Sequence, residues 1–379
     1  MFKFQIVESE DIQAVIDVLK SDWLTTGPRV KEFERALAEF VGTKEAVVVS
    51  NGTAALHTMV SCLDIQEGDE VLIPTMTFVA TANCIVYRKA KPVFVDVNPE
   101  TLLIDLEDLE RKLSPRTRAI IAVDYAGQPC DYEELKTVAQ SRNITLLADA
   151  CHALGGKYQG QPVGSLATAS TFSFHAVKNI TTGEGGAITT DDVVLARKMR
   201  IFRNHGISED HHQRDREKTW VYQMTDLGFN YRLTDFQCAL GISQLKHLPQ
   251  WIERRNEIAE RYNKFFARVP YLEPLKTKSG VLNAYHLYVV KLNLEQLKIS
   301  REMVYREMKN RGLAVNVHYI PVHLQPYYRE HFDTGPGLCP RAEWVYERIL
   351  SLPVSPAMTN EQVDLVASTL LEILESNLK

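Results

Sequence analysis

Three short segments carry residues that could act together on a phosphorylated ligand. The first, SNGTAAL at 50–56, is a turn of small residues between a predicted strand and a predicted helix. Backbone N–H groups at such a helix start, with the hydroxyl of Thr53, form a possible phosphate site. The second, ITLLADACH, ends an apolar strand at Asp149, and the third, STFSFHAVKNITTGEGG, places Lys178 in a small, polar, glycine-rich loop.

Each of these features also has an ordinary structural explanation. Asn51 or Thr53 can simply cap a helix, and Asp149 can do the same at the end of its strand. A single loop lysine is usually solvated. Phe78, in PTMTFVATAN, can be an ordinary core residue. The combination is therefore more specific than any of its parts.

Taken together, these residues match what pyridoxal phosphate requires of a protein. The cofactor needs a lysine for covalent attachment, an acid at its ring nitrogen and donors for its phosphate. Lys178 and Asp149 supply the first two. Thr53 and Ser173 supply hydroxyls for the phosphate, and Phe78 supplies an aromatic face for the ring. An aspartate keeps the ring nitrogen protonated, so that the ring can accept electrons from a carbanion.

Other common chemistries lack their sequence signals. The turn after the first strand has one glycine, not the G-x-G-x-x-G of a nicotinamide site, and neither a P-loop nor a G-x-S-x-G motif occurs. The histidines show no credible three-ligand grouping, so no metal site is expected. We therefore expect an enzyme that depends on an organic cofactor.

Composition narrows the class of protein further. The chain has 379 residues, enough for roughly two to three domains. Its net charge of -5 argues against a nucleic-acid partner, and no apolar run is long enough to predict a membrane span. The six cysteines are spread without a CxxC pair, and no signal peptide is visible. These features predict a cytoplasmic protein.

The elements that must position these residues follow an α/β pattern. From about residue 44, short β-branched runs alternate with helical stretches, which predicts a largely parallel sheet covered by helices. A hairpin at 156–165 and two successive strands around Lys178 make the predicted sheet mixed. A helical stretch at 233–269 is expected to break at Gly241 and Pro249.

A second, smaller α/β pattern occupies the C-terminal part of the chain. It includes a strand predicted in AVNVHYI at 314–320 and a final amphipathic helix. We expect a large cofactor-binding domain at 1–250, with the N-terminal segment contributing to the substrate site, and a small domain at 251–379.

At this level of detail the chain resembles a known family, the DegT/DnrJ/EryC1/StrS group of pyridoxal-phosphate-dependent sugar aminotransferases. The similarity runs from WLTTGPRVKEFE near the N-terminus to ILSLPVSPAMT near the C-terminus. The block FSFHAVKNITTGEGG is highly diagnostic, and GFNYRLTDFQCALGISQLK is another strong block. The resemblance implies fold type I, with Lys178 as the cofactor-attachment residue and Asp149 as the partner of the ring nitrogen.

The resemblance also assigns the remaining cofactor contacts. His152 stands where many members have glutamine, and its imidazole can still donate to the ring hydroxyl. Asn230 is implied to reach the phosphate of the neighbouring subunit, so a homodimer with shared sites is expected. The full set of implied cofactor contacts is Gly52, Thr53, Ala54, Phe78, Asp149, His152, Ser173, Lys178 and Asn230.

The substrate is implied by the branch of the family that the chain resembles most. DACHALG, HLYVV and VNVHYIPVHLQPYY are most similar to the pseudaminic-acid branch, which aminates C4 of a UDP-linked 4-keto-6-deoxy-N-acetylhexosamine with glutamate as donor. The implied substrate contacts are Trp23, Leu24, Thr25, Thr26, Gly52, Ser173, Asn230, His318 and Tyr319. Packing at a domain seam is an equal alternative for the residues at the N-terminal segment and in the small domain.

Four other functions stay open at this point. The nearest is a different nucleotide-sugar aminotransferase, acting at C3 or on a dTDP-linked sugar. A sugar dehydratase of the same group would replace the lysine by histidine, and a cysteine desulfurase would need a mobile reactive cysteine. A regulatory protein that kept the fold for sensing is disfavoured because Lys178 and Asp149 are both present.

Overall fold

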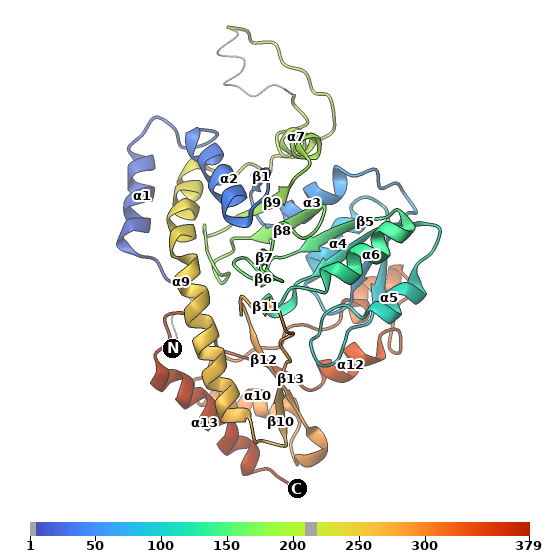
Figure 1. The fold of residues 1–379 in the computed structure, drawn as a ribbon, viewed down its shortest axis with the longest axis vertical. Coiled ribbons are helices and arrows are strands. Elements are labelled where there is room, and N and C mark those ends of the chain that lie inside the picture. Colours follow the sequence, from blue (N-terminus) through green and yellow to red (C-terminus); the bar gives the residue numbers. More distant parts are fainter. Residues whose placement is uncertain (1–4, 209–217) are drawn as a thin grey trace.

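A mixed sheet lies at the centre of the computed structural model, which describes residues 5–208 and 218–379 (Figure 1). Within the described residues, seven strands form this sheet in the order β1-β9-β8-β5-β4-β2-β3. The five strands from β8 to β3 are mutually parallel, whereas β9 is antiparallel to both of its neighbours. The strands are β1 (Glu45–Val49), β2 (Glu70–Pro74), β3 (Lys91–Val95), β4 (Thr117–Val123), β5 (Thr145–Asp149), β8 (Ala169–Ser173) and β9 (Gly186–Thr190). The predicted mixed, mostly parallel α/β sheet is confirmed.

The central strands form because their sequences are nearly continuous apolar runs. Every residue of β2 is buried, and in β4 only Arg118 is exposed. Such runs belong to strands that are covered on both faces, because no alternate position has to meet water. The functional residues therefore have to lie where these strands end.

Helices connect and cover the strands. Helix α3 contacts β8 and β9, α6 contacts β5, and α1 and α2 pack against the long helix α9. The helices of this part are α1 (Ser9–Leu19), α2 (Pro28–Val41), α3 (Gly52–Ser61), α4 (Val79–Val86), α5 (Leu106–Lys112), α6 (Tyr132–Arg142) and α7 (Val193–Phe202), with a 3-10 turn, η1 (Tyr125–Gly127).

A second, antiparallel sheet with the order β10-β12-β13 lies in the C-terminal part. The predicted hairpin is present as β6 (Lys157–Tyr158) and β7 (Gln161–Pro162), and β11 (Val281–Leu282) pairs with it. The other elements here are β10 (Leu272–Pro274), β12 (Tyr288–Leu292), β13 (Ile349–Leu352), η2 (Leu294–Gln296), η3 (Val322–Leu324), α10 (Arg301–Asn310), α11 (Pro326–His331), α12 (Pro340–Tyr346) and α13 (Asn360–Glu375).

Helix α9 (Asp235–Phe266) runs along both parts of the molecule, from beside α2 to the sheet of β10, β12 and β13 (Figure 1). Its residues up to Ile252 belong to a core cluster built around the large sheet, and those from Ile258 onward belong to a second cluster with α10 and α13. The large-domain and small-domain division at 1–250 and 251–379 stays a prediction, and α9 crosses the proposed boundary.

The expected breaks in this helix were wrong, because α9 continues through Gly241 and Pro249. A helix tolerates an internal proline at the loss of one backbone hydrogen bond when surrounding packing offsets it, and the neighbours Leu248 and Trp251 are buried. Gly241 is required by packing, since a Cβ there would lie 2.5 Å from Cζ of Phe33.

The strand expected at 314–320 was also wrong. Only one isolated bridge, Asn316 to Ser351, joins this segment to β13. Beyond it the polar groups bond elsewhere: Nδ1 of His318 lies 2.9 Å from the hydroxyl of Ser351, and the Tyr125 hydroxyl donates to the His318 carbonyl. The segment therefore follows the wall of a cavity instead of extending a sheet.

Gly241→Ala tests the packing explanation for the glycine in α9. Replacing an interior helical glycine by alanine normally stabilises by about 0.5–1 kcal/mol. Here we expect destabilisation of about 1–3 kcal/mol, because the added methyl overpacks against Phe33. Melting temperatures of the two proteins measure this. Gly335→Ala, with no atom within 4 Å of the added carbon, is the control, and an unchanged or raised melting temperature for Gly241→Ala would refute the explanation.

Candidate active site

A cavity of about 1160 Å³ lies at the carboxyl ends of β5 and β8, the edge at which open α/β sheets bind ligands. Most residues that the sequence singled out line it, although they come from separate segments. The predicted residues in its wall are Gly52, Thr53, Ala54, Phe78, Asp149, His152, Ser173, Lys178, His318 and Tyr319.

The start of α3 forms one side of the cavity. Asn51 is the N-cap of this helix, and its side chain accepts the backbone N–H of Ala54 at 2.8 Å. The first N–H groups of a helix have no partner within the helix, so those of Gly52 and Thr53 remain for a ligand. An anion is favoured at such a helix start. Asn51 is thus the helix cap, and Gly52 and Thr53 line the cavity, whereas their role as a phosphate site stays a prediction.

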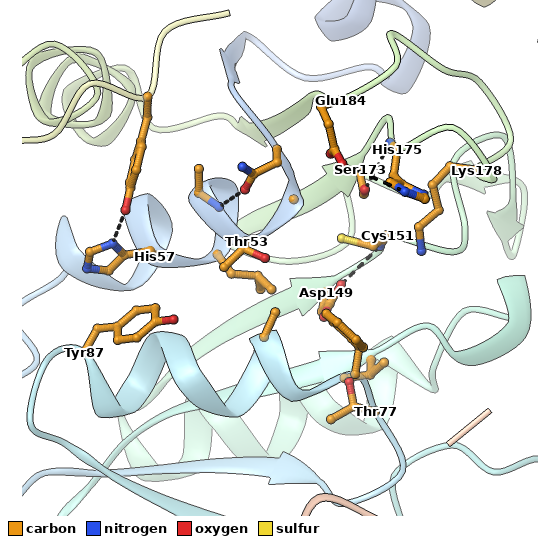
Figure 2. Close-up of a pocket in the computed structure, with 18 of the residues that line it drawn as sticks. Thr53, His57, Thr77, Tyr87, Asp149, Cys151, Ser173, His175, Lys178 and Glu184 are labelled. Carbon is orange, nitrogen blue, oxygen red and sulfur yellow. Dashed lines mark hydrogen bonds and ion pairs between the residues drawn. The ribbon is translucent and has the colours of Figure 1, made fainter. Parts of the chain in front are cut away.

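Gly52 is needed because α3 approaches β8 closely. A Cβ at position 52 would lie 2.8 Å from Cβ of Ser173, which has no room to move at the end of its strand. The close approach brings the hydroxyls of Thr53 and Ser173 to the same side of the cavity (Figure 2). Two hydroxyls and two free N–H groups form a cradle of the size and polarity of a phosphate group.

Asp149 is buried, with 6% of its surface exposed, and its carboxylate is held by hydrogen bonds. The hydroxyl of Thr81 donates to Oδ2 at 2.7 Å, and the backbone N–H of Cys151 donates to Oδ1 at 3.2 Å. Because Thr81 uses its one proton on Asp149, the Thr77 hydroxyl donates to Thr81 at 2.7 Å. These bonds provide each carboxyl oxygen of Asp149 with a donor and fix the direction of the side chain.

Lys178 lies in the loop between β8 and β9, and its side chain extends toward Asp149 and Cys151 (Figure 2). The loop is pinned next to the lysine, since the amide of Asn179 donates to the carbonyls of Leu154 and Ala284. Burial lowers the pKa of the Lys178 amine, although the acidic groups of Cys151 and Asp149 act in the opposite direction. A lower pKa makes the neutral, nucleophilic amine easier to form.

Histidines and a tyrosine form the wall near Lys178. Nε2 of His152 lies 3.0 Å from the hydroxyl of Tyr319, and its Nδ1 is buried without a hydrogen-bond partner among the described residues. Burial, with a smaller contribution from the positive charge of Lys178, lowers the pKa of His318 to about 4 and that of His152 well below its usual range. These imidazoles are therefore neutral at physiological pH.

Phe78 and Tyr319 provide the aromatic surface of the cavity. Their ring centroids are 6.0 Å apart, and Phe78 is 55% exposed although it begins α4 beside the buried core. Exposure of a phenylalanine in a cavity wall leaves its face available to stack on a planar ligand. The ordinary-core alternative for Phe78 is wrong.

Five predicted residues do not line the cavity of this chain. Trp23, Leu24, Thr25 and Thr26 lie at the start of α9, where the Leu24 carbonyl accepts the N–H of Asp235 at 3.0 Å. Asn230 precedes α9 in the sequence and is exposed, and it forms an isolated antiparallel β-bridge with Asn204. Within one chain, the structure does not bring these residues together with Lys178.

Several residues of the wall or its support were missed by the sequence reasoning, among them Thr81 and His286. Thr81 was visible only as part of PTMTFVATAN, and His286 only as the first letter of HLYVV. Helical spacing could have indicated Thr81, since it lies one turn after Thr77 at the start of α4. For His286, no local signal exists, because its place in the cavity depends on how the two parts of the chain meet.

The chain belongs to the DegT/DnrJ/EryC1/StrS aminotransferase family, whose model matches residues 5–371. It is 38% identical to the spore coat polysaccharide biosynthesis protein SpsC of Bacillus subtilis, over 99% of this chain and 97% of SpsC. Among solved structures, Helicobacter pylori PseC, an aminotransferase involved in pseudaminic acid biosynthesis, matches with a TM-score of 0.93 and 35% identity over 99% of both chains. Spr1654 of Streptococcus pneumoniae, in its PMP form, matches with a TM-score of 0.93 and 32% identity over 98% of both chains.

The protein is thus a sugar aminotransferase of the kind that uses pyridoxal phosphate. The residues present fit this cofactor: the Gly52 cradle suits its phosphate, and the partnerless Nδ1 of His152 is a buried polar atom that a ligand would satisfy.

In residues 5–208 and 218–379, no group of three or more His, Cys, Asp or Glu side chains could hold a metal ion. None of the helices described there is long and apolar enough to cross a bilayer.

Asp124→Asn tests an electrostatic consequence of the buried site. The N–H of Asp124 donates to the Asp149 carbonyl at 3.1 Å, and burial raises the pKa of the Asp124 carboxyl to about 7, although bonds from Cys130 and Tyr132 oppose this. In the unfolded chain this pKa is about 3.9. The folded protein therefore binds the proton more tightly, and this contribution to stability is lost as the pH rises from about 4 through 7.

The measurement is the free energy of unfolding of both proteins between pH 4.5 and 7.5. We expect the variant to gain stability relative to the wild type as the pH rises, because asparagine cannot ionise. The control is Asp17→Asn on the exposed face of α1, which should follow the wild-type curve. Parallel curves for Asp124→Asn and the wild type would show that Asp124 does not titrate in this range.

Proposed function

We propose that this protein transfers the amino group of glutamate to C4 of a UDP-linked 4-keto-6-deoxy-N-acetylhexosamine, the reaction of the pseudaminic acid branch. The supporting observation is the likeness to PseC over 99% of the chain, together with the DACHALG and HLYVV segments that resemble that branch. The likeness to SpsC, a spore coat polysaccharide protein, is of similar extent. The sugar therefore has to be decided by direct assay.

The proposed roles follow from the geometry of the wall. Bound pyridoxal phosphate supplies an electron-accepting ring that stabilises the carbanion formed when a proton leaves the amino donor. Asp149, held by Thr81 and Cys151, faces the ring nitrogen as a carboxylate. Lys178 attaches the cofactor and, once free, takes and returns the proton through Nζ. Its lowered pKa suits both steps.

The other cofactor contacts are proposed from the same wall. The start of α3, at Gly52, Thr53 and Ala54, holds the phosphate with Ser173, because these residues surround the cradle. Phe78 stacks on the ring face, and His152 bonds the ring hydroxyl through the imidazole nitrogen that lacks a partner. His318 and Tyr319 line the same cavity and face the sugar.

A panel of keto sugars tests the proposed substrate. The enzyme, converted to its amino form by glutamate, is mixed with 4-keto and 3-keto sugars linked to UDP or dTDP, and the return of the cofactor absorption is recorded. We expect the UDP-linked 4-keto N-acetylhexosamine to react fastest. A faster reaction with a 3-keto or dTDP-linked sugar would replace the proposed substrate by that one.

Lys178→Ala tests the attachment residue in the same assay. The variant should fold as the wild type does but lose turnover and the covalent cofactor that borohydride traps, because the other lysines that the structure describes lie outside the cavity wall. Lys157→Ala, on an exposed hairpin, is the control and should keep both. Trapping at the wild-type level in Lys178→Ala would contradict the assignment.

We also propose a homodimer in which each chain completes the partner's site. Asn230 and Trp23–Thr26 cluster around the start of α9 and do not line the cavity of their own chain. The segment before Asn230 exposes large apolar side chains outside the cavity wall, among them Trp220 at 86% and Met224 at 66%. Exposed apolar surface of this kind is typical of an interface. A two-fold axis would bring this surface of one chain to the other's cavity.

Mixed dimers test this arrangement. We expect Lys178→Ala and Asn230→Ala each to impair activity, and the isolated mixed dimer, with one chain of each kind, to recover toward half of the wild-type activity. Recovery occurs because one site of each mixed dimer carries both defects and the other carries neither. If Asn230 served its own chain, each site would keep one defect and mixing would restore nothing. The proposal would also be excluded if sedimentation showed that the fully active protein is a monomer.

A further inference from the structure

His286 enters the cavity from a segment whose backbone is firmly held. The N–H of Leu287 donates to the Ala126 carbonyl at 3.1 Å, and the buried guanidinium of Arg255 donates to the Tyr285 carbonyl at 2.9 Å. The His286 ring lines the cavity with its centroid 4.4 Å from that of His152. Its position is therefore fixed by the chain on both sides of it.

Unlike the neighbouring imidazoles, the His286 ring has no hydrogen-bond partner in the described part of the chain. Its Nδ1 is buried and unpaired, and no bond is formed by its Nε2, which is the ring nitrogen left accessible. By contrast, His152 pairs with Tyr319 and His318 pairs with Ser351. A polar ring in a cavity wall without any protein partner is a group that a ligand would satisfy.

The protonation of His286 follows from its surroundings. Burial, and next the positive charge of Lys178, lowers its pKa well below the usual range, so the ring is neutral. A neutral imidazole carries one N–H and one lone pair. A buried N–H without a partner is rarer in proteins than an unsatisfied acceptor, which assigns the lone pair to the enclosed Nδ1. The proton then lies on Nε2, and His286 presents a hydrogen-bond donor to the cavity.

The kind of oxygen that suits this donor follows from the charges nearby. The nearest polar groups of the wall, His152, His318 and Tyr319, are uncharged. Two cations also act on His286, but Lys178 is the proposed attachment residue and Arg255 donates to the carbonyls of Tyr285 and Val354. A dicarboxylate amino donor is bound best by charged donors that are free to contact it.

Arg88 also lines the cavity, and its positive charge acts on His57. His57 lies at the end of the cavity away from Lys178 (Figure 2). We propose that Nε2 of His286 donates a hydrogen bond to an uncharged oxygen of the sugar substrate, a hydroxyl or carbonyl, and not to the amino donor or the cofactor.

This inference rests on the proposed function only in taking a keto sugar as the amino acceptor. It predicts that His286 affects one of the two half-reactions. In His286→Phe the ring packing against His152 is kept and the donor is lost. We expect the KM for the sugar to rise by about ten-fold, the effect of losing one neutral hydrogen bond at a buried site. The rate at which glutamate converts the cofactor should stay within about two-fold of the wild-type rate, because the lost hydrogen bond does not involve the amino donor.

The experiment uses the full-length holoenzyme and follows each half-reaction by cofactor absorption. The acceptor is the keto sugar nucleotide that the wild type uses fastest in the panel, so a different sugar there would overturn the proposed substrate and still leave this test intact. His286→Gln, which keeps an N–H donor, should recover part of the loss. His331→Phe, on the exposed helix α11, is the matched control and should behave as the wild type.

Three results would overturn the inference. Equal losses in both half-reactions would mean that His286 supports the fold of the site. A displaced cofactor absorption band before any substrate is added would mean that it bonds the cofactor. An unchanged KM for the sugar would mean that no bond to the sugar exists. Should His286→Phe fail to bind the cofactor, the comparison of His286→Gln with His286→Ala decides in the same way.

Discussion

The active site depends first on the hydrogen bonds that satisfy a carboxyl group inside the protein. Asp149 is almost fully buried, and an ionised carboxylate in such a place is costly unless donors surround it. Thr81 and the backbone of Cys151 provide these donors, and Thr77 fixes the direction of the Thr81 hydroxyl. The carboxyl group is thus satisfied on the protein side, and its proposed partner on the cavity side is the cationic ring of the cofactor.

The sheet determines which groups can meet this carboxylate. Parallel pairing of β5 with β8 places Asp149 opposite Thr171, so that Ser173 ends its strand at the same edge and the loop with Lys178 begins there. Gly52 then allows α3 to start against Ser173. Strand register and close packing thus bring the start of α3, the amine of Lys178 and the carboxyl group of Asp149 to one cavity. Each of these groups comes from a different element.

The cavity wall contributed by the C-terminal part has a different character. His286, His318 and Tyr319 come from this part, and the two imidazoles are held neutral by burial and by the positive charge of Lys178. This wall offers neutral hydrogen-bonding groups next to the reactive amine. Such a lining suits a polyhydroxylated substrate, whereas the α3 start opposite it suits an anion.

Much of the site could be predicted from the sequence because its key residues lie at visible transitions. Asp149 is the last residue of an apolar strand, whereas Thr53 and Lys178 lie shortly after the ends of theirs, and the type of each residue shows the chemistry that it can do. The alternation of strands and helices indicated a largely parallel sheet, and the hairpin and the successive strands around Lys178 indicated that it is mixed.

Contacts between distant segments were decided only by the tertiary structure. Helix α9 continues through Pro249 because packing on both sides offsets the lost hydrogen bond, which no local rule can show. The segment at 314–320 follows the cavity because its polar groups bond to Tyr125 and Ser351. His286 acquires its place beside His152 only when the two parts of the chain meet. Sequence patterns record the burial of a residue along its own element, whereas these positions depend on which other element lies opposite.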